Sequence, residues 1–139
     1  MGGEYTLRAL SVPESLSQLH ELLEDVASEH PSVMPEDLLL FETAVVEIAG
    51  NVVKHGRPPG EVVWRFRLRV LEDRLEGILT DSGEHYAHDL EALMPGILEE
   101  SGRGLPLARA AVDTLTYERA DGINRWNLVR SLRGSRSQV

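Results

Sequence analysis

Three polar side chains recur at helical intervals within a largely apolar stretch, and their types suit acid–base and ligand chemistry. Glu47, Asn51 and His55 follow one another at every fourth position, with Lys54 beside them. On a helix this spacing places neighbours on one face, about one turn and roughly 6 Å apart. Because the residues from Thr43 to Val53 are mostly Ala, Val or Ile, such a helix is buried nearly all round. The polar column therefore either lines a cleft or forms a satisfied structural pair.

Gly50 interrupts the same stretch. A glycine in a helix interior costs about 1 kcal/mol relative to alanine. Its presence is explained either by a group that approaches the helix backbone closely or by close packing against another helix. The sequence leaves both explanations open.

Two further clusters contain residues that suit binding. Asp81 and Gly83 follow the end of a predicted strand, although such a pair is also common in ordinary turns. The run Gly102-Arg103-Gly104-Leu105 opens a predicted helix, and N–H groups at a helix start suit phosphate. This run is not a dinucleotide fingerprint, because Leu107 stands where a third glycine belongs, and it lacks the Gly-Lys-Ser/Thr of a Walker A loop.

The composition predicts one globular domain. The chain has 139 residues, of which 42% are hydrophobic and 27% charged, enough for a single core. We expect one domain over residues 1–139, with a polar, frayed tail at 133–139. There is no cysteine, which excludes disulfides, thiolate metal sites and cysteine nucleophiles.

The charge balance bears on possible partners. Asp and Glu total 23 against 14 Lys and Arg, which gives a formal net charge of -9. This acid excess argues against direct binding of nucleic acid, which needs clustered cations, and leaves open a basic protein partner. No apolar run approaches about 18 residues, and the first residues lack a signal-peptide core. We therefore expect a cytoplasmic protein without membrane association.

Hydrophobic periodicity divides the chain into helices and strands. A 3.6-residue apolar stripe predicts a helix over Pro35–His55, and alternation with arginines predicts a strand over Glu61–Leu71, with a slip at Trp64. An earlier helix is expected to begin at Pro13 with Ser11 as its cap. The other expected elements are strands at Tyr5–Val12, Arg74–Asp81, Leu115–Arg119 and Asn124–Leu132, a helix at Gly104–Asp113, and an irregular segment at Ser82–Ser101 with a short helical patch around Leu90.

The resulting order is β-α-α-β-β-loop-α-β-β. It differs from the regular alternation of a doubly wound parallel sheet. We expect an α+β fold, a two-layer α/β sandwich with the helices on one face of a mixed, mostly antiparallel sheet.

In this order the three polar clusters resemble the N, G1 and G2 boxes of the GHKL ATPase superfamily, whose members share the Bergerat ATP-binding fold. The boxes read Glu47-x-x-x-Asn51-x-x-Lys54-His55, Asp81-x-Gly83, and Gly102-x-Gly104-Leu105 before a helix. Within the superfamily, the compact chain and its run Gly-Arg-Gly-Leu-Pro-Leu-Ala-Arg are most similar to the bacterial anti-sigma-factor serine/threonine kinases. The resemblance extends from Tyr5 to about Leu132.

The resemblance implies a role for the first two boxes. Asn51 would give its side-chain oxygen to Mg²⁺. Glu47 would act as the catalytic general base or orient the attacking hydroxyl. Asp81 would accept a hydrogen bond from the exocyclic amine of adenine, which selects ATP over GTP, and Gly83 would let the backbone pass close to the ring.

The remaining residues of the boxes would contact the phosphates of ATP. The run Gly102-Arg103-Gly104 would present N–H groups at the start of the third helix, with Leu105 packed behind them. Lys54 and His55 would neutralise phosphate charge, or would interact with the end of their own helix.

The chain departs from the family pattern at two places. Glu84-His85-Tyr86 follows the Asp-x-Gly box, where family members often carry a further Gly and a Phe. Gly122-Ile123-Asn124 stands where many relatives have a Gly-Thr pair. We therefore expect the strand-borne hydroxyl beneath the adenine pocket to be missing.

The resemblance also implies a function in transcription regulation, as an ATP- and Mg²⁺-dependent kinase. Members of this family bind a sigma factor, phosphorylate a serine of an anti-anti-sigma (STAS) antagonist and act as homodimers. Two alternatives remain: a nucleotide-gated module that sequesters its partner without phosphorylating it, and a detached catalytic domain of the histidine-kinase type.

Overall fold

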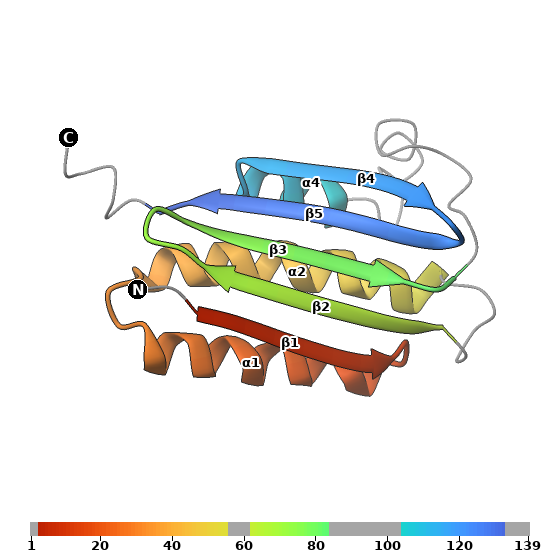
Figure 1. Ribbon diagram of the computed structural model, residues 1–139, viewed down its shortest axis with the longest axis horizontal. Helices are drawn as coiled ribbons and strands as arrows, with labels where there is room; N and C mark the ends of the chain where they lie inside the picture. Colours follow the sequence, from red (N-terminus) through yellow and green to blue (C-terminus); the bar gives the residue numbers. More distant parts are fainter. Residues whose placement is uncertain (1–2, 56–61, 84–103, 133–139) are drawn as a thin grey trace.

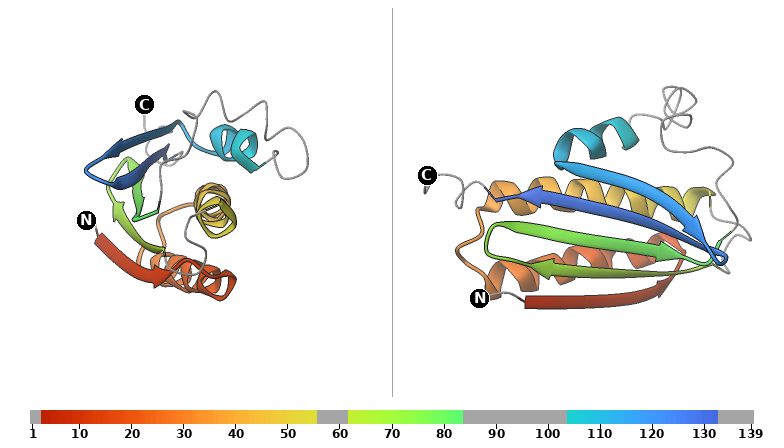
Figure 2. Two further views of the ribbon diagram at one scale, coloured as in Figure 1. Left: turned by 90° about the vertical axis from the view of Figure 1, so that its right-hand side faces the viewer. Right: turned by 45° about the horizontal axis from the view of Figure 1, so that its top comes forward.

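The structure is a computed structural model that describes residues 3–55, 62–83 and 104–132, with the backbone alone at 55, 104 and 105. Its elements are β1 (Gly3–Leu10), η1 (Pro13–Ser15), α1 (Leu16–Glu29), α2 (Pro35–His55), β2 (Val63–Val70), β3 (Arg74–Asp81), α4 (Gly104–Ala111), β4 (Thr114–Ala120) and β5 (Ile123–Ser131). The helices lie on one face of a five-stranded sheet (Figures 1 and 2), which confirms the two-layer α+β sandwich. None of the described helices has the length and apolar character needed to span a membrane.

The observed elements follow the predicted ones closely. α2 and β3 begin and end where the periodicity places them, and the remaining strands shift by one or two residues at their ends. The segment that starts at Pro13 is a short 3-10 helix before α1 begins. The predicted helical patch around Leu90 and the tail at 133–139 lie outside the described residues.

The sheet has the strand order β1-β2-β3-β5-β4, and each ladder between the described strands is antiparallel. In β2 the alternation runs through Trp64 without the predicted slip, because Trp64 is fully buried and Val63 takes the outward position. The arginines of β2 are exposed on that outer face. The sheet thus has an apolar face under the helices and a polar outer face.

α2 is the central element of the helical layer and lies between α1 and α4 over the sheet (Figure 2). Its buried side chains recur every three or four residues, as for Leu38, Phe41, Ile48 and Val52, which is typical of a helix that buries one broad stripe. The sheet and α2 are in close contact at Gly77 of β3, where an added Cβ would lie 2.9 Å from Cζ of Phe41. Gly77 therefore sets how near α2 can come to the sheet.

A buried ion pair joins three elements at one end of the molecule. Arg130 of β5 donates to Oδ1 of Asp37 through Nε at 2.9 Å and Nη2 at 2.8 Å. Its Nη1 donates to the backbone carbonyl of Ala111 at 2.8 Å. Asp37 lies in the first turn of α2 and Ala111 is the last residue of α4, so each charge also suits the dipole of the helix end that it meets. We call Arg130, Asp37 and the Ala111 carbonyl the Arg130 cluster.

Ser11 ties the opposite end of α2 to the sheet, and it does not cap the first helix as the sequence predicts. Its Oγ donates to the carbonyl of Val52 at 3.1 Å, and its backbone N–H donates to the carbonyl of Val62 at 2.7 Å. Ser11 is buried, and η1 begins without a side-chain cap. The last four carbonyls of a helix lack helical partners, so the end of α2 offers a buried hydroxyl the acceptor that it needs.

Replacing Arg130 with leucine should destabilise the fold by about 3 kcal/mol or more, because the substitution leaves the Asp37 carboxylate buried without its guanidinium. The matched control is Arg125→Leu on the same strand, whose exposed side chain lies 4.0 Å from Glu118 and should change stability by less than about 1 kcal/mol. Urea unfolding followed by circular dichroism measures both changes. Equal losses in the two variants would contradict a structural role for the Arg130 cluster.

Candidate functional site

The polar column of α2 lies on the flank of the helix that turns away from the sheet. Glu47 and Asn51 are half-buried and Lys54 is exposed, whereas Ile48 and Val52 are fully buried in the core. Glu47 and Asn51 thus occupy one side of the helix, one turn apart, as their spacing predicts. The side chain of His55 lies outside the described residues.

The amide of Asn51 is oriented by a hydrogen bond within the helix. Its Nδ2 donates to the backbone carbonyl of Glu47 at 3.0 Å. This bond uses the donor side of the amide and leaves Oδ1 as an acceptor without a partner among the described residues. An amide oxygen and a carboxylate on consecutive turns are hard ligands of the type that suits Mg²⁺.

Gly50 leaves a gap on the exposed side of the same helix. A Cβ built there would meet no described atom within 4 Å, apart from its chain neighbours and the nearby backbone of α2 itself. Packing against another described helix therefore does not account for this glycine. The space beside Gly50 is open in the described part of the chain.

Asp81, the last residue of β3, is held so that one carboxylate oxygen has no partner. Its Oδ1 accepts hydrogen bonds from the backbone N–H of Gly83 at 2.9 Å and from Nδ2 of Asn124 at 2.9 Å. Its Oδ2 is buried and has no hydrogen-bond partner among the described residues. A buried acceptor without a partner costs free energy, so Oδ2 is the oxygen of Asp81 that is open to a further hydrogen-bond donor.

Asn124 of β5 organises the surroundings of Asp81. The two residues are direct partners in the antiparallel ladder between β3 and β5. Oδ1 of Asn124 accepts from the hydroxyl of Tyr117 at 2.6 Å and from Nη1 of Arg119 at 3.0 Å. The same Nη1 donates to the carbonyl of Gly83 at 2.9 Å. We call these residues (Asp81, Gly83, Tyr117, Arg119 and Asn124) the Asp81 network.

Sequence reasoning misses three members of this network, all from β4 and β5. It treats Asn124 only as the place where a hydroxyl is absent, whereas the amide bonds Asp81 directly and Tyr117 brings a hydroxyl to the same group. An Asn among the buried positions of β5 is a signal that the strand alternation could have supplied. Tyr117 and Arg119 become recognisable only once the register of β4 on β5 is known.

The surroundings of Asp81 raise its pKa above the ordinary value of 3.8. Burial is the largest cause, because it penalises the charged carboxylate. The hydrogen bonds from Asn124 and from the N–H of Gly83 act in the opposite direction, as does the charge of Arg119. A ligand that donates a hydrogen bond to Oδ2 would favour the charged form further.

Asp81 and the polar half of α2 lie at the same end of the molecule. Ser82, which follows Asp81, donates its N–H to the carbonyl of Val63 at 3.1 Å. Val62, the residue before β2, accepts a hydrogen bond from the backbone N–H of Ser11. The hydroxyl of Ser11 donates to the carbonyl of Val52 near the end of α2. Figure 1 shows the end of α2 and the end of β3 on this same side. The structure therefore brings the first two boxes to one end of the sandwich.

α4 lies beside α2 and begins at Gly104, as predicted (Figure 2). Its last residue is fixed by the Arg130 cluster at the far end of the sheet, so α4 starts on the side of Asp81. Gly102, Arg103 and the side chain of Leu105 lie outside the described residues. Of the third box, the structure thus places only the start of the helix.

A metal ion at this site would depend on few protein ligands. In the described part of the chain, no group of three or more His, Asp or Glu side chains is arranged to hold a metal. Mg²⁺ is commonly bound by one or two protein oxygens together with phosphate oxygens and water. Oδ1 of Asn51 fits that coordination, because its amide nitrogen is already bonded to the helix.

The raised pKa of Asp81 predicts a pH-dependent stability. Above pH 3.8 the unfolded chain loses this proton first, and the folded protein keeps it up to its higher pKa, so the contribution of Asp81 to the free energy of unfolding falls over that interval. The variant Asp81→Asn lacks this contribution. The stability of the wild type relative to the variant, from urea unfolding between about pH 3 and pH 7, should therefore decrease as the pH rises.

The control for this measurement is Asp25→Asn, at an exposed position of α1. This variant also removes one carboxylate but leaves the surroundings of Asp81 unchanged, so it controls for the change in net charge. A stability difference between the wild type and Asp81→Asn that is constant with pH, or that changes in the opposite sense, would contradict the burial of an ionisable carboxyl at this position.

Known proteins share this architecture. A family model described as a histidine kinase-like ATPase domain matches residues 10–129. Among solved structures, the chain is similar to the RsbU and RsbW domains of Rv1364c from Mycobacterium tuberculosis, with a TM-score of 0.67 and 16% identity, over 94% of this chain and 32% of that chain. It is also similar to the histidine kinase domain of the blue-light activated histidine kinase from Erythrobacter litoralis EL346, with a TM-score of 0.59 and 15% identity, over 88% of this chain and 63% of that chain. No curated protein matches the sequence.

The two solved structures share the fold at low identity, and this chain spans about a third of the first and less than two thirds of the second. The family match covers most of the chain and includes α2, Asp81 and the start of α4. It confirms the resemblance to the GHKL ATPases that the three boxes indicate. The chain therefore belongs to the family of histidine kinase-like ATPase domains.

Proposed function

We propose that this chain is an ATP-dependent serine/threonine kinase of the anti-sigma-factor type, which binds a sigma factor and phosphorylates a serine of an anti-anti-sigma STAS protein. The observation that carries the nucleotide site is the buried Oδ2 of Asp81, which has no hydrogen-bond partner among the described residues. Membership of the ATPase-domain family supports ATP as the ligand. The three boxes support the kinase class by resemblance.

Adenine suits Asp81 by its hydrogen-bonding groups. The exocyclic amine of adenine is a donor, whereas guanine presents an acceptor at the equivalent position. Oδ1 of Asp81 is already used by Gly83 and Asn124, so Oδ2 is the oxygen that remains for the amine. This arrangement favours ATP over GTP.

Glu47 and Asn51 suit the phosphate end of the nucleotide. Oδ1 of Asn51 would hold Mg²⁺, and Glu47 would accept the proton of the attacking serine hydroxyl. The serine oxygen forms a bond to the γ-phosphorus while the bond from that phosphorus to the β–γ bridging oxygen breaks, so that ADP leaves and the proton stays on Glu47. Magnesium-ATP would supply the phosphoryl group for this transfer when bound, and its Mg²⁺ would neutralise part of the phosphate charge.

The start of α4 and the end of α2 would hold the phosphates. Gly104 is the first residue of α4, and helix N-termini bind phosphate through free N–H groups and the helix dipole. Lys54 is exposed near the end of α2 and would neutralise phosphate charge together with His55. Residues 102–105 complete the phosphate site that we propose.

Our choice of partners rests on the resemblance to the anti-sigma-factor kinases. The run Gly102–Arg109 is similar to that of the anti-sigma-factor kinases, and the fold is shared with a chain that contains an RsbW domain. Kinases of this class act as homodimers in the cytoplasm and regulate transcription through a sigma factor. We extend this assembly to the present chain, without direct contact to nucleic acid.

Asp81→Asn should weaken binding of the ATP analogue AMP-PNP with Mg²⁺ by roughly tenfold or more, because either orientation of the new amide places a donor against a donor. Isothermal titration calorimetry measures the affinity. Asp25→Asn should leave the affinity unchanged, and the wild type should bind AMP-PNP more tightly than GMP-PNP. Equal affinities of the wild type and Asp81→Asn would remove Asp81 from the adenine pocket.

Glu47→Gln should keep the AMP-PNP affinity within about twofold and lower the transfer of radiolabelled phosphate to a STAS protein by roughly 100-fold or more, because an amide cannot take the hydroxyl proton. The matched control is Glu42→Gln on the opposite flank of α2, where Glu42 contacts His20 of α1 at 2.7 Å. That variant should transfer phosphate at the wild-type rate. Wild-type transfer by Glu47→Gln would show that Glu47 is not the base.

The chemistry of the product separates the alternative functions. Acid-stable phosphoserine on the STAS protein supports the proposed kinase. Binding of AMP-PNP without transfer to any STAS partner supports the nucleotide-gated sequestering module. Acid-labile phosphohistidine supports a catalytic domain of the histidine-kinase type.

A further inference from the structure

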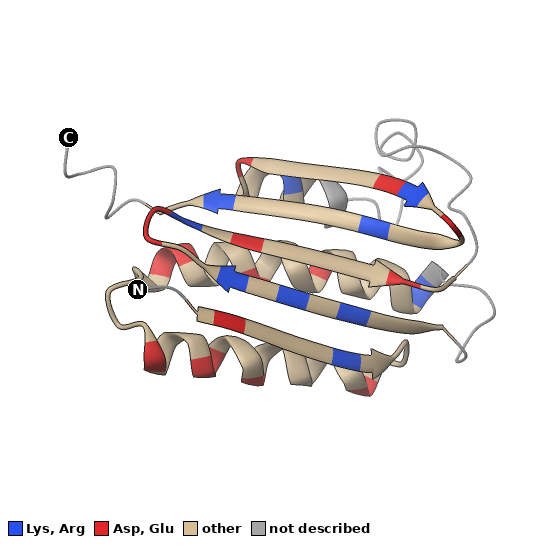
Figure 3. Cartoon of the chain, in the orientation of Figure 1, with Lys and Arg blue, Asp and Glu red and all other residues tan. Residues whose placement is uncertain are grey.

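The outer face of the sheet carries arginines that the nucleotide site does not use. Arg8 of β1 lies opposite Arg65 of β2, and the same row continues through Thr80 of β3 to Arg125 of β5. Arg67 follows on the same face of β2. These four arginines are exposed, and Figure 3 shows the strands that carry them in front of the helical layer. We call Arg8, Arg65, Arg67 and Arg125 the arginine face.

Three of the four residues of the arginine face have no acidic partner in the described part of the chain. No Asp or Glu there forms an ion pair with Arg8, Arg65 or Arg67, whereas Arg125 pairs with Glu118 of β4 at 4.0 Å. Arg8 and Arg65 stand directly opposite each other, and like charges at opposite positions of an antiparallel pair are destabilising. An anionic partner bound to this face would relieve that repulsion.

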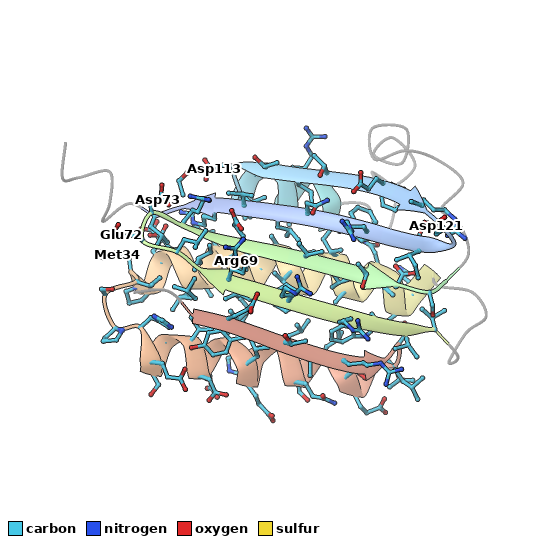
Figure 4. All side chains as sticks on the ribbon, viewed as in Figure 1. Met34, Arg69, Glu72, Asp73, Asp113 and Asp121 are labelled. Carbon is cyan, nitrogen blue, oxygen red and sulfur yellow. The ribbon has the colours of Figure 1, made fainter. Side chains whose placement is uncertain are left out.

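Elsewhere on the same outer face, the arginines are paired. Near the hairpin between β2 and β3, Arg69 bonds Glu76 at 3.2 Å, and Arg74 bonds Glu76 at 2.7 Å and Asp73 at 2.8 Å. Figure 4 labels Arg69 on this part of the sheet, with Glu72 and Asp73 at the hairpin. The outer face therefore supplies acids to its arginines near this hairpin, and among the described residues it leaves Arg8, Arg65 and Arg67 without an acidic partner.

The positive charge of the arginine face is opposite in sign to the net charge of the whole chain. The formal net charge is -9, and Figure 3 shows acidic residues spread over the helices and at the hairpins. A local cluster of cations on an acidic protein orients an incoming anionic segment toward that cluster.

We propose that the arginine face docks an acidic helical segment of another protein. A guanidinium binds a carboxylate through paired N–H donors. Positions two apart on a strand, such as Arg65 and Arg67, are separated by about 6.8 Å. Carboxylates one turn apart on a helix are separated by about 6 Å, so successive acids of such a segment match successive arginines of β2. This surface is independent of the nucleotide site, because the sheet lies between the outer face and the helices.

A second copy of this chain and a nucleic acid fit the arginine face less well. A symmetric dimer through this face would set arginines against arginines, because both subunits of a two-fold interface use the same patch. A nucleic acid extends far beyond a patch of this size and would meet the field of a chain with net charge -9. A short acidic protein segment contacts the cations alone.

The test uses a fluorescein-labelled, alanine-based helical peptide with glutamates one turn apart, and fluorescence anisotropy at low salt. The full chain should bind this peptide, and the double variant Arg65→Glu/Arg67→Glu should bind it roughly tenfold more weakly or worse. The matched control Arg69→Glu/Arg74→Glu makes the same change in net charge at the paired end and should lose less than about threefold. Arg65→Gln/Arg67→Gln is a second variant that removes the cations without adding acids, and it should also weaken binding.

AMP-PNP affinity, measured on the same variants, should stay at the wild-type value, which shows that they are folded and keeps this test separate from the nucleotide site. Three results would overturn the docking surface. They are no binding of the peptide by the wild type, equal losses in the two double variants, and tighter binding of single-stranded DNA than of the peptide. Sedimentation that shows a wild-type dimer dissociated by Arg65→Glu/Arg67→Glu would assign the face to a second copy instead.

Discussion

The Arg130 cluster fixes the helical layer to the sheet at one end of the molecule. Taking an ion pair out of water is costly, and such a pair is stable only where its geometry is good. One guanidinium here reaches the first turn of α2 and the last carbonyl of α4 from within β5. With Ser11 holding the other end of α2, the helix that carries Glu47 and Asn51 is fixed at both ends. Glu47 and Asn51 lie between these two attachments, on the half-buried flank of α2.

The Asp81 network holds a buried carboxylate in place through only one of its two oxygens. Hydrogen bonds from Gly83 and Asn124 converge on Oδ1 and leave Oδ2 without a partner among the described residues. Arg119 and Tyr117 hold Asn124 in turn. Gly50 is a second place where the local choice of residue lowers stability, since alanine is the better helix former.

The sequence predicts well what local periodicity decides, such as the bounds of α2 and β3 and the common face of Glu47 and Asn51. It does not predict contacts that depend on which strand lies beside which. Asn124 bonds Asp81 across 43 positions, and Ser11 bonds Val52 across 41. Alternation tells which face a side chain takes, but the neighbour on that face is set by register and by the packing of the helices.

Gly77 links the packing of the core to the proposed nucleotide site, although it lies outside that site. It lies on the strand that ends in Asp81, directly beneath the ring of Phe41 on α2. The two parts of the proposed nucleotide site lie on these two elements, so the absence of a side chain at position 77 sets the distance between them. A larger residue at this remote position would shift one part of the proposed site relative to the other and so change nucleotide affinity, while every residue proposed to contact the nucleotide stays the same.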